Sequence, residues 1–368
     1  MKILVTGADG FIGQNLCIVL SEQEGVEVLR VSRTTSDSAL EALAGQADAV
    51  IHLAGVNRPQ DPADFAAGNA DFTKRLCNLV SKAGRAIPIA FASSIQAERD
   101  NPYGTSKRQA EEHLAEYGRS SGAPVALYRL VNVFGKWSRP EYNSAVATFC
   151  HNIARDLPIR IDNPSAQIRL IYIDDVVAEL VQFLANPGQG VRYPEAGPEY
   201  SITVGELARQ IEAFRDLRNT LLIERVGTGL IRALYATYVS FLPPAAFSYS
   251  VPKHGDARGV FVEMLKTRDS GQFSFFTAHP GITRGGHYHH TKTEKFLVIK
   301  GQARYRFRHM TTDETYEVEA GGEEPMIVET IPGWAHDITN IGDEELVVML
   351  WANEIFDPDR PDTITSKV

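Results

Sequence analysis

Short apolar runs alternate with longer helical patterns through the first half of the chain. Spans of helix length separate the runs, which cover residues 3–6, 27–31, 49–53, 89–92 and 125–128. Strands that alternate with helices in this way indicate βαβ units and a parallel sheet covered by helices. We therefore predict an α/β domain with a Rossmann-type, doubly wound parallel sheet.

The pattern changes after Pro252. Gly, Asn and Asp turns join shorter apolar runs there, at residues 260–265, 295–299, 303–307 and 346–351. Many short strands of this kind are typical of an all-β fold. We predict two domains, 1–245 and 246–368, with fold class α/β plus all-β. The end of the chain, 357–368, is rich in Asp, Pro and Thr and is expected to be frayed.

A net charge of −9 leaves no basic surface for nucleic acid or an anionic membrane, which favours a small soluble substrate. The apolar stretch 230–247 contains Arg232 and Pro243, so we expect a packed helix there rather than a membrane span. A strand begins at Lys2, which leaves no room for a secretion signal. The three cysteines are widely spaced and predict no disulfide framework. A cytoplasmic protein is expected.

Gly7, Gly10 and Gly13 follow the first predicted strand and precede a helical pattern. Glycines let the turn close tightly and let backbone amides reach a pyrophosphate, and the helix N-terminus adds partial positive charge. About twenty residues further on, where an NAD enzyme has a ribose-binding acid, the chain reads Arg30-Val31-Ser32-Arg33. Arg33 therefore favours NADP, whose 2′-phosphate pairs with a guanidinium. An arginine on a solvated loop is the alternative.

Ser94 ends a predicted strand, and Tyr103 and Lys107 follow with a spacing of four. That spacing puts the tyrosine and the lysine on one helix face. Reduction of a ketone by hydride needs a proton donor for the developing alkoxide, and an ammonium beside a phenol lowers the phenol pKa. Alone, such a pair is more often a surface contact; with the glycine loop it predicts a reductase.

Residues 1 to about 240 resemble the extended short-chain dehydrogenase/reductase family. The resemblance rests on TGADGFIG (6–13), HLAG (52–55), FASS (91–94), YGTSK (103–107), RLVNVFG (129–135) and IYIDDV (171–176). It implies that Ser94, Tyr103 and Lys107 are catalytic and that Asn132 and Arg169 bind a nucleotide sugar. The implied cofactor-binding residues are Gly7, Gly10, Phe11, Ile12, Gly13, Arg33, Leu53, Ala54, Tyr103 and Lys107. The Asp-Glu pair of the dehydratases is missing after Ser94, which favours a simple reductase.

His287 and His289 lie one residue apart on a predicted strand and so point to the same face. Together with Glu294 they offer a mixed nitrogen and oxygen ligand set for a divalent cation. A polar strand face is the alternative for an isolated pair. Here the spacing G-x5-HxH-x4-E-x6-G, from Gly281 to Gly301, resembles the first motif of the cupin jelly-roll barrels.

The second cupin motif is only partial, because Met326 stands where its leading glycine should be. His336 keeps the closing spacing to Asn340 and is the expected fourth ligand. A bulged strand would let His290 replace His289. Such sites accept iron, manganese, nickel or zinc, and we expect zinc.

Residues 254–263 resemble the D-x-RG-x-F-x-E stretch of the deoxysugar 3,5-epimerases. The resemblance implies Arg258, Phe261 and Glu263 as substrate-binding residues, and a strand with one alternating face is the alternative. It does not identify the catalytic base. The possible bases are His279, Tyr288, His290 and Tyr305.

The whole chain resembles bifunctional enzymes of capsular polysaccharide synthesis in which a reductase is fused to a zinc cupin. That resemblance implies C3 epimerisation of a UDP-2-acetamido-2,6-dideoxy-4-hexulose, NADPH reduction to the 6-deoxy-talose sugar, and a homodimer. A proton at C3 is removable only while C4 is a ketone, so epimerisation is expected first. Two alternatives remain: a reductase with a non-catalytic metal-stabilised cupin, and an iron cupin oxygenase fused to an NADP-binding sensor.

Overall fold

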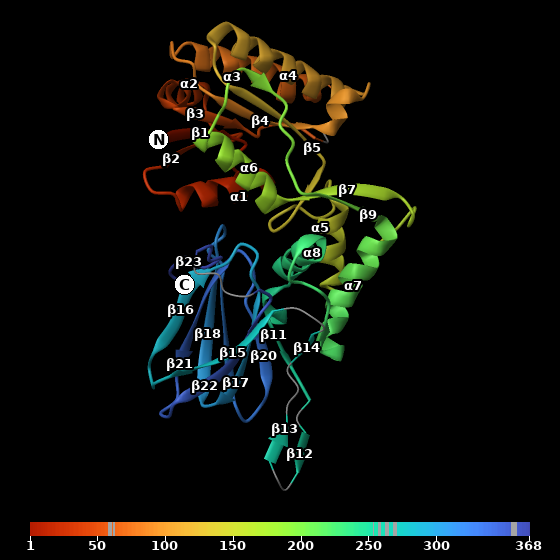
Figure 1. Cartoon of the computed structure of the whole chain (residues 1–368), viewed down its shortest axis with the longest axis vertical. Coiled ribbons are helices and arrows are strands. Elements are labelled where there is room, and N and C mark those ends of the chain that lie inside the picture. The colour runs from red at the N-terminus through yellow and green to blue at the C-terminus, as the bar shows by residue number, and fades with distance from the viewer. Residues whose placement is uncertain are drawn as a thin grey trace. The chain divides into compact units, whose positions relative to one another are not determined.

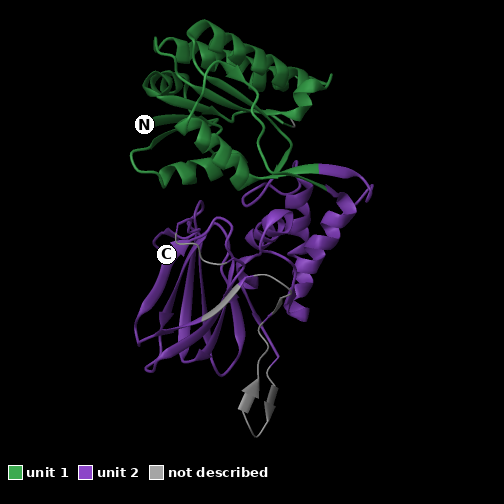
Figure 2. Ribbon diagram, viewed as in Figure 1, with its two compact units in different colours: residues 1–133, 169–201 green, residues 134–168, 202–368 purple. Residues whose placement is uncertain are grey.

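The computed structural model describes residues 1–57, 61, 63–252, 254–256, 259–261, 265–267, 271–354 and 359–368, with the backbone alone for 254–256, 259–261, 266–267 and 272–274. The chain forms two compact units, which Figure 2 shows in different colours. The first contains residues 1–133 and 169–201, and the second contains residues 134–168 and 202–368.

The first unit contains a six-stranded parallel sheet in the order β2-β1-β3-β4-β5-β8. Its strands are β1 (Lys2–Thr6), β2 (Glu27–Val31), β3 (Ala49–His52), β4 (Ile89–Ser94), β5 (Val125–Leu130) and β8 (Val191–Arg192). The prediction of an α/β domain is confirmed. The order reverses between β1 and β3, and in open α/β sheets ligands bind at such a switch point, outside the carboxyl ends of the strands.

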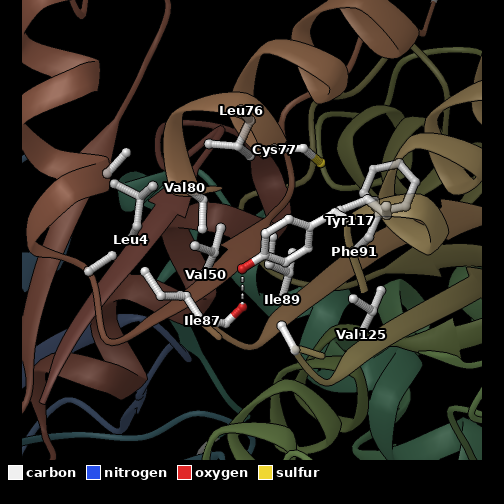
Figure 3. Close-up of a cluster of buried hydrophobic side chains, with 14 of the residues drawn as sticks. Leu4, Val50, Leu76, Cys77, Val80, Ile87, Ile89, Phe91, Tyr117 and Val125 are labelled. Atoms are coloured by element: carbon white, nitrogen blue, oxygen red, sulfur yellow. Dashed lines mark hydrogen bonds between the residues drawn. The ribbon is translucent and has the colours of Figure 1, made fainter. Parts of the chain in front are cut away.

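Helices cover both faces of this sheet (Figure 1), namely α2, α3 and α4 on one face and α1 and α6 on the other. Their bounds are α1 (Phe11–Ser21), α2 (Asp37–Gln46), α3 (Phe72–Ser81), α4 (Pro102–Ser121) and α6 (Ile173–Ala185), with η1 (Ala66–Asp71) before α3 and η2 (Ile95–Glu98) before α4. Leu76 and Val80 of α3 meet Phe91 of the sheet in a buried apolar cluster (Figure 3). Within it, the Tyr117 hydroxyl donates a hydrogen bond of 2.8 Å to the carbonyl of Ile87.

The second unit contains two antiparallel five-stranded sheets, in the orders β11-β20-β17-β22-β15 and β19-β18-β21-β16-β23. Their strands are β11 (Ser248–Ser250), β15 (Gln272–Ala278), β16 (Thr283–Tyr288), β17 (Glu294–Lys300), β18 (Gln302–His309), β19 (Thr315–Gly321), β20 (Met326–Glu329), β21 (Trp334–Asn340), β22 (Leu346–Ala352) and β23 (Ile364–Thr365). The rings of Phe296 and Tyr305 meet between the two sheets, with centroids 5.8 Å apart. The all-β prediction is confirmed for this part of the chain.

Three further helices belong to the second unit: α5 (Ala145–Ile153), α7 (Val204–Thr220) and α8 (Gly229–Ser240). Arg218 of α7 forms a 2.5 Å ion pair with the buried carboxylate of Glu329 on β20, and Lys295 of β17 contacts the same carboxylate. Residues 202–245 therefore belong to the same compact unit as the antiparallel sheets. The domain boundary at residue 245 stays a prediction.

The shorter elements complete the topology. Strands β6 (Asn132–Phe134), β7 (Gln167–Tyr172) and β9 (Glu199–Thr203) form one sheet, β10 (Leu222–Ile223) pairs with β14 (Lys266–Thr267), β12 (His254–Asp256) pairs with β13 (Gly259–Phe261), and η3 (Pro244–Ala246) precedes β11. The expectation of a packed helix within 230–247 is met by α8. Within the described residues, no helix is long and apolar enough to cross a membrane.

The expectation of a frayed C-terminus is wrong for the described residues 359–368. Backbone pairing places Thr365 opposite His287 and Ile364 opposite Tyr288, so this segment forms β23 at the edge of a sheet. Composition misled here, because polar residues form a strand when a neighbouring strand offers its backbone groups.

Candidate functional site

The glycine loop lies at the carboxyl end of β1. Gly7 has φ +68, and a Cβ atom there would lie 2.8 Å from the amide nitrogen of Ala54, so only glycine fits. The Gly10 amide donates to the Gly7 carbonyl at 2.9 Å, and α1 begins at the next residue. The loop therefore places a helix N-terminus at the β1/β3 switch point, as a bound pyrophosphate requires.

The loop also contacts the carboxyl end of β2. The amide of Ala8 donates to the carbonyl of Val31 at 3.1 Å, which places Ser32 and Arg33 beside the glycine loop. Arg30 forms an ion pair of 3.0 Å with Asp9 of the loop. Arg33 is exposed two residues beyond β2.

His52, at the end of β3, is a residue whose role the sequence prediction missed. Its ring nitrogens lie 2.7 Å and 2.8 Å from the hydroxyl oxygens of Thr6 and Thr73. Thr6 in turn accepts from the amides of Leu53 and Ala54, both at 3.2 Å. Burial, together with the charge of Lys107, lowers the pKa of His52 to about 3, so the ring is neutral and holds the ends of β1 and β3 together.

Helix α4, which carries Tyr103, packs tightly against the segment that follows Ser94. A Cβ atom on Gly104 would lie 2.2 Å from the carbonyl oxygen of Gln96, so only glycine allows this approach. The Asn101 side chain caps the helix by accepting from the amide of Gly104 at 2.8 Å. Ser94 accepts from the Gln96 amide at 3.2 Å, which leaves its hydroxyl hydrogen to donate elsewhere.

Lys107 is buried on the same helix. Its Nζ donates to the carbonyl of Ala92 at 3.0 Å and lies 4.6 Å from the ring centroid of Phe91. Burial lowers the pKa of Lys107 to about 8, although the charge of Glu111 opposes the shift. An ammonium held in this way can stabilise a phenolate on the preceding turn of the helix.

The structure also brings Asn132 and Arg169 together. The Asn132 side-chain amide donates to the carbonyl of Arg169 at 2.9 Å. The Arg169 guanidinium forms an ion pair of 2.5 Å with Glu199. A pyrophosphate at this arginine would share it with, or displace, that carboxylate.

A second group of chemical interest lies in the β-sheets. His287 on β16, His289 just after it, Glu294 at the start of β17 and His336 on β21 each offer one ligand atom, all within 4.8 Å of one another. Nε2 of His289 and Nε2 of His336 lie 3.2 Å and 3.6 Å from the same Glu294 oxygen. His290, the alternative ligand, is also described but is not part of this group.

The electrostatics of the group suit a cation. Burial, reinforced by the neighbouring His336 and His289, lowers the pKa of His287 to about 3, so its imidazole is neutral. Burial would raise the pKa of Glu294, but the neighbouring imidazoles of His289 and His336 and the charge of Lys292 hold it well below its ordinary value. Both ring nitrogens of His336 are buried and have no hydrogen-bond partner among the described residues. Neutral imidazoles and an ionised carboxylate are the forms that bind a divalent metal.

Other predicted site residues are placed less fully. Arg258 and Glu263 lie outside the described residues, and Phe261 is described by its backbone alone, in β13. Among the possible bases, Tyr288 and Tyr305 are buried, while His279 is exposed and the ring of His290 lies edge-on to Tyr288, with centroids 5.5 Å apart. The structure does not single out one of them.

Family models match both parts of the chain. A model described as the NAD dependent epimerase/dehydratase family matches residues 3–196, and one described as a polysaccharide biosynthesis C-terminal domain matches residues 254–364.

Individual proteins extend these matches. The chain is 59% identical over 368 residues to UDP-2-acetamido-2,6-beta-L-arabino-hexul-4-ose reductase of Pseudomonas aeruginosa, covering 100% of this chain and 99% of that protein. Part of the chain is similar to the spore coat polysaccharide biosynthesis protein SpsL of Bacillus subtilis. The two are 28% identical over 120 residues, which cover 30% of this chain and 80% of that protein. The crystal structure of the capsular polysaccharide assembling protein CapF from Staphylococcus aureus superposes with a TM-score of 0.69 at 39% identity, covering 100% of both chains. The predicted resemblance to fused enzymes of capsule synthesis is confirmed.

Proposed function

Because the chain belongs to the NAD dependent epimerase/dehydratase family, we propose that it is a bifunctional enzyme acting on a UDP-4-keto sugar. The substrate is a UDP-2-acetamido-2,6-dideoxy-4-hexulose. The C-terminal domain inverts C3, and the N-terminal domain reduces the C4 ketone with NADPH. The product is UDP-N-acetyl-6-deoxy-talosamine, a capsule or O-antigen precursor on the route to N-acetyl-L-fucosamine. The name of the Pseudomonas relative, a reductase of such a 4-ulose, supports this substrate class.

The observation that carries the proposal is the placement of Ser94 and the helix of Tyr103 and Lys107 at the carboxyl end of β4. NADPH, bound at the glycine loop, supplies a hydride to C4. Tyr103 donates its phenolic proton to the carbonyl oxygen as the alkoxide forms, and Ser94 donates a hydrogen bond to the same oxygen. The Lys107 ammonium stabilises the resulting phenolate until solvent returns its proton.

Other residues bind the parts of NADPH and of the UDP-sugar that do not react. Arg33 pairs with the 2′-phosphate of NADPH, which makes this cofactor preferred over NADH. Arg169 and Asn132 hold the pyrophosphate side of the UDP-sugar. These roles rest on the contacts described above and on the family resemblance.

The order of the two reactions follows from their chemistry. Loss of the C3 proton leaves an electron pair that only a neighbouring C4 carbonyl can accept as an enolate. After reduction C4 is an alcohol, and the C3 proton is no longer acidic. Epimerisation therefore precedes reduction.

His287, His289, Glu294 and His336 hold one divalent metal, which we propose is zinc. When bound, zinc is a Lewis acid without redox chemistry. The chain's own residues fit it because three imidazoles and one carboxylate offer ligand atoms that all lie within 4.8 Å of one another. We further propose that the protein is cytoplasmic and forms a homodimer, as the resemblance implies.

The test is incubation of the protein with the UDP-4-keto sugar and NADPH in heavy water, with the product analysed by NMR. We expect NADPH oxidation, deuterium at C3 and inverted configuration at that carbon. Reduction without deuterium would leave a 4-keto reductase with a non-catalytic metal-binding domain. No NADPH oxidation at all would reject the reductase assignment.

A further inference from the structure

The C-terminal segment of the chain closes over the strand that carries His287. Thr365 pairs with His287 and Ile364 with Tyr288, and the Ser366 amide donates to the carbonyl of Gly286 at 2.9 Å. The segment therefore runs antiparallel to the strand that leads into the His/Glu group. It is continuous with Asp362, whose contacts with that group are the basis of the inference.

The Asp362 carboxylate accepts hydrogen bonds from three consecutive backbone amides. One oxygen accepts from His290 at 2.8 Å, and the other accepts from Thr291 and Lys292, both at 2.7 Å. The Thr291 hydroxyl adds a fourth hydrogen bond of 3.1 Å. Successive amides that point at one anion form a concave nest, and charge-assisted hydrogen bonds of this kind are stronger than neutral ones.

These amides belong to the loop that joins two predicted ligands, His289 and Glu294. Other side chains also contact this loop: the Arg232 guanidinium donates to the Thr291 hydroxyl at 3.0 Å, Lys292 lies 3.1 Å from Glu294, and the Asn353 side-chain oxygen accepts from the Thr293 amide at 2.9 Å. The Asp362 carboxylate, however, binds the amides of three of the four residues between the two ligands.

The backbone of the same residue contacts the ligand itself. Nδ1 of His289 lies within hydrogen-bonding distance of the carbonyl oxygen of Asp362. A carbonyl oxygen can only accept, so Nδ1 carries the hydrogen and Nε2 keeps its lone pair. That lone pair is on the side of the ring that faces Glu294, at 3.2 Å.

We propose that Asp362 is a positioning residue for the metal site, through which the C-terminal segment selects the His289 tautomer and fixes the loop between the ligands. The proposal rests on the assignment of a metal to this group. Residues that hydrogen-bond to metal ligands without touching the metal contribute about 10–100-fold to metal affinity. The metal site would therefore depend on a residue that follows Glu294 by 68 positions in the sequence.

The test measures metal binding to the full-length protein with Zn²⁺, by competition with a chromophoric chelator, and with Co²⁺, by its visible absorption spectrum. Asp362→Asn keeps the backbone carbonyl and the side-chain size but places an amide group against the three N–H donors. We expect Zn²⁺ affinity to fall about 10–100-fold and the Co²⁺ spectrum to change shape. Asp343→Asn, which neutralises an exposed carboxylate of the same unit, should leave both unchanged.

The outcomes separate the two proposals. If the unaltered protein binds neither ion, the metal assignment fails. If it binds both and Asp362→Asn binds them equally well with an identical spectrum, the role of Asp362 is rejected. A further measurement needs neither metal nor a stable variant: the ¹⁵N NMR spectrum of the metal-free protein should show His289 protonated at Nδ1, and protonation at Nε2 instead would contradict the proposal.

Discussion

The indole ring of Trp137 lies so close to the backbone of Gly333 that a Cβ atom at position 333 would be 2.7 Å from the ring. Gly333 has φ +84, and its amide donates to the carbonyl of His289 at 3.1 Å. Trp137 follows the RLVNVFG segment of the predicted reductase domain. Trp137 and Gly333 both belong to the second unit. Trp137 therefore packs on the loop whose backbone binds His289, a predicted metal ligand.

We predict that Gly333→Ala destabilises the protein and weakens metal binding. A non-glycine residue in this backbone conformation costs about 1–3 kcal/mol, and contact with Trp137 adds to that cost. Thermal or denaturant unfolding measures the loss. Gly281→Ala is the matched control, because Gly281 has φ +76 and no atom lies within 4 Å of the position that its Cβ atom would take. Equal losses in the two variants would show that the contact with Trp137 contributes nothing.

Tyr103→Phe should abolish reduction while leaving exchange at C3 intact. Loss of a positioned proton donor lowers the rate of such a step by about 10²–10⁴-fold. NADPH oxidation followed by absorbance measures the first effect, and deuterium incorporation from heavy water measures the second. If exchange is also lost, the two activities do not reside in separate sites.

The reductase should lose activity as the pH rises through about 8. Burial lowers the pKa of Lys107 to about 8, so above that pH the ammonium loses its proton and no longer stabilises the Tyr103 phenolate. The value of kcat/KM for the ketone, which reports groups of the free enzyme, should therefore be high below this pH and fall above it. A profile that stays flat up to pH 10 would contradict the role of Lys107.

Arg33→Ala should change the choice of cofactor. A charge-assisted hydrogen bond contributes about 1.5–3 kcal/mol, so KM for NADPH should rise about 10–100-fold. KM for NADH, which has no 2′-phosphate, is the internal control and should stay within about twofold, since no comparable hydrogen bond is lost. Steady-state kinetics with both cofactors measures the difference. An equal rise for both would assign Arg33 to another role.

Removal of metal should lower the stability of the second unit. A metal present at 100 times its dissociation constant stabilises the native state by about 2.7 kcal/mol. A chelator should therefore lower the melting temperature of the unaltered protein but not that of His336→Ala, which has already lost a ligand. NADPH binding, measured by fluorescence, should be unaffected, because the glycine loop belongs to the first unit. A melting temperature that does not respond to the chelator would exclude a stabilising metal.

Local patterns predicted most of the fold. The alternation of strands and helices has a short period along the chain, and the observed β1 to β5 coincide with the predicted runs. The glycine loop, the Tyr103/Lys107 pair and the histidine pair are similarly local, since their members are separated by a few residues on one element. Spacing alone therefore identified these groups, and their catalytic and ligand roles stay predictions.

The sequence by itself thus determined the two fold classes, the position of the glycine loop and the candidate residues for a metal-binding group. Only the tertiary structure decided that His289 rather than His290 joins that set, that Glu199 pairs with Arg169, and that the C-terminal segment is ordered around Asp362. The physical reason is distance along the chain. Periodicity records which face of an element is buried, but it carries no signal for a carboxylate that reaches three amides 70 to 72 residues away.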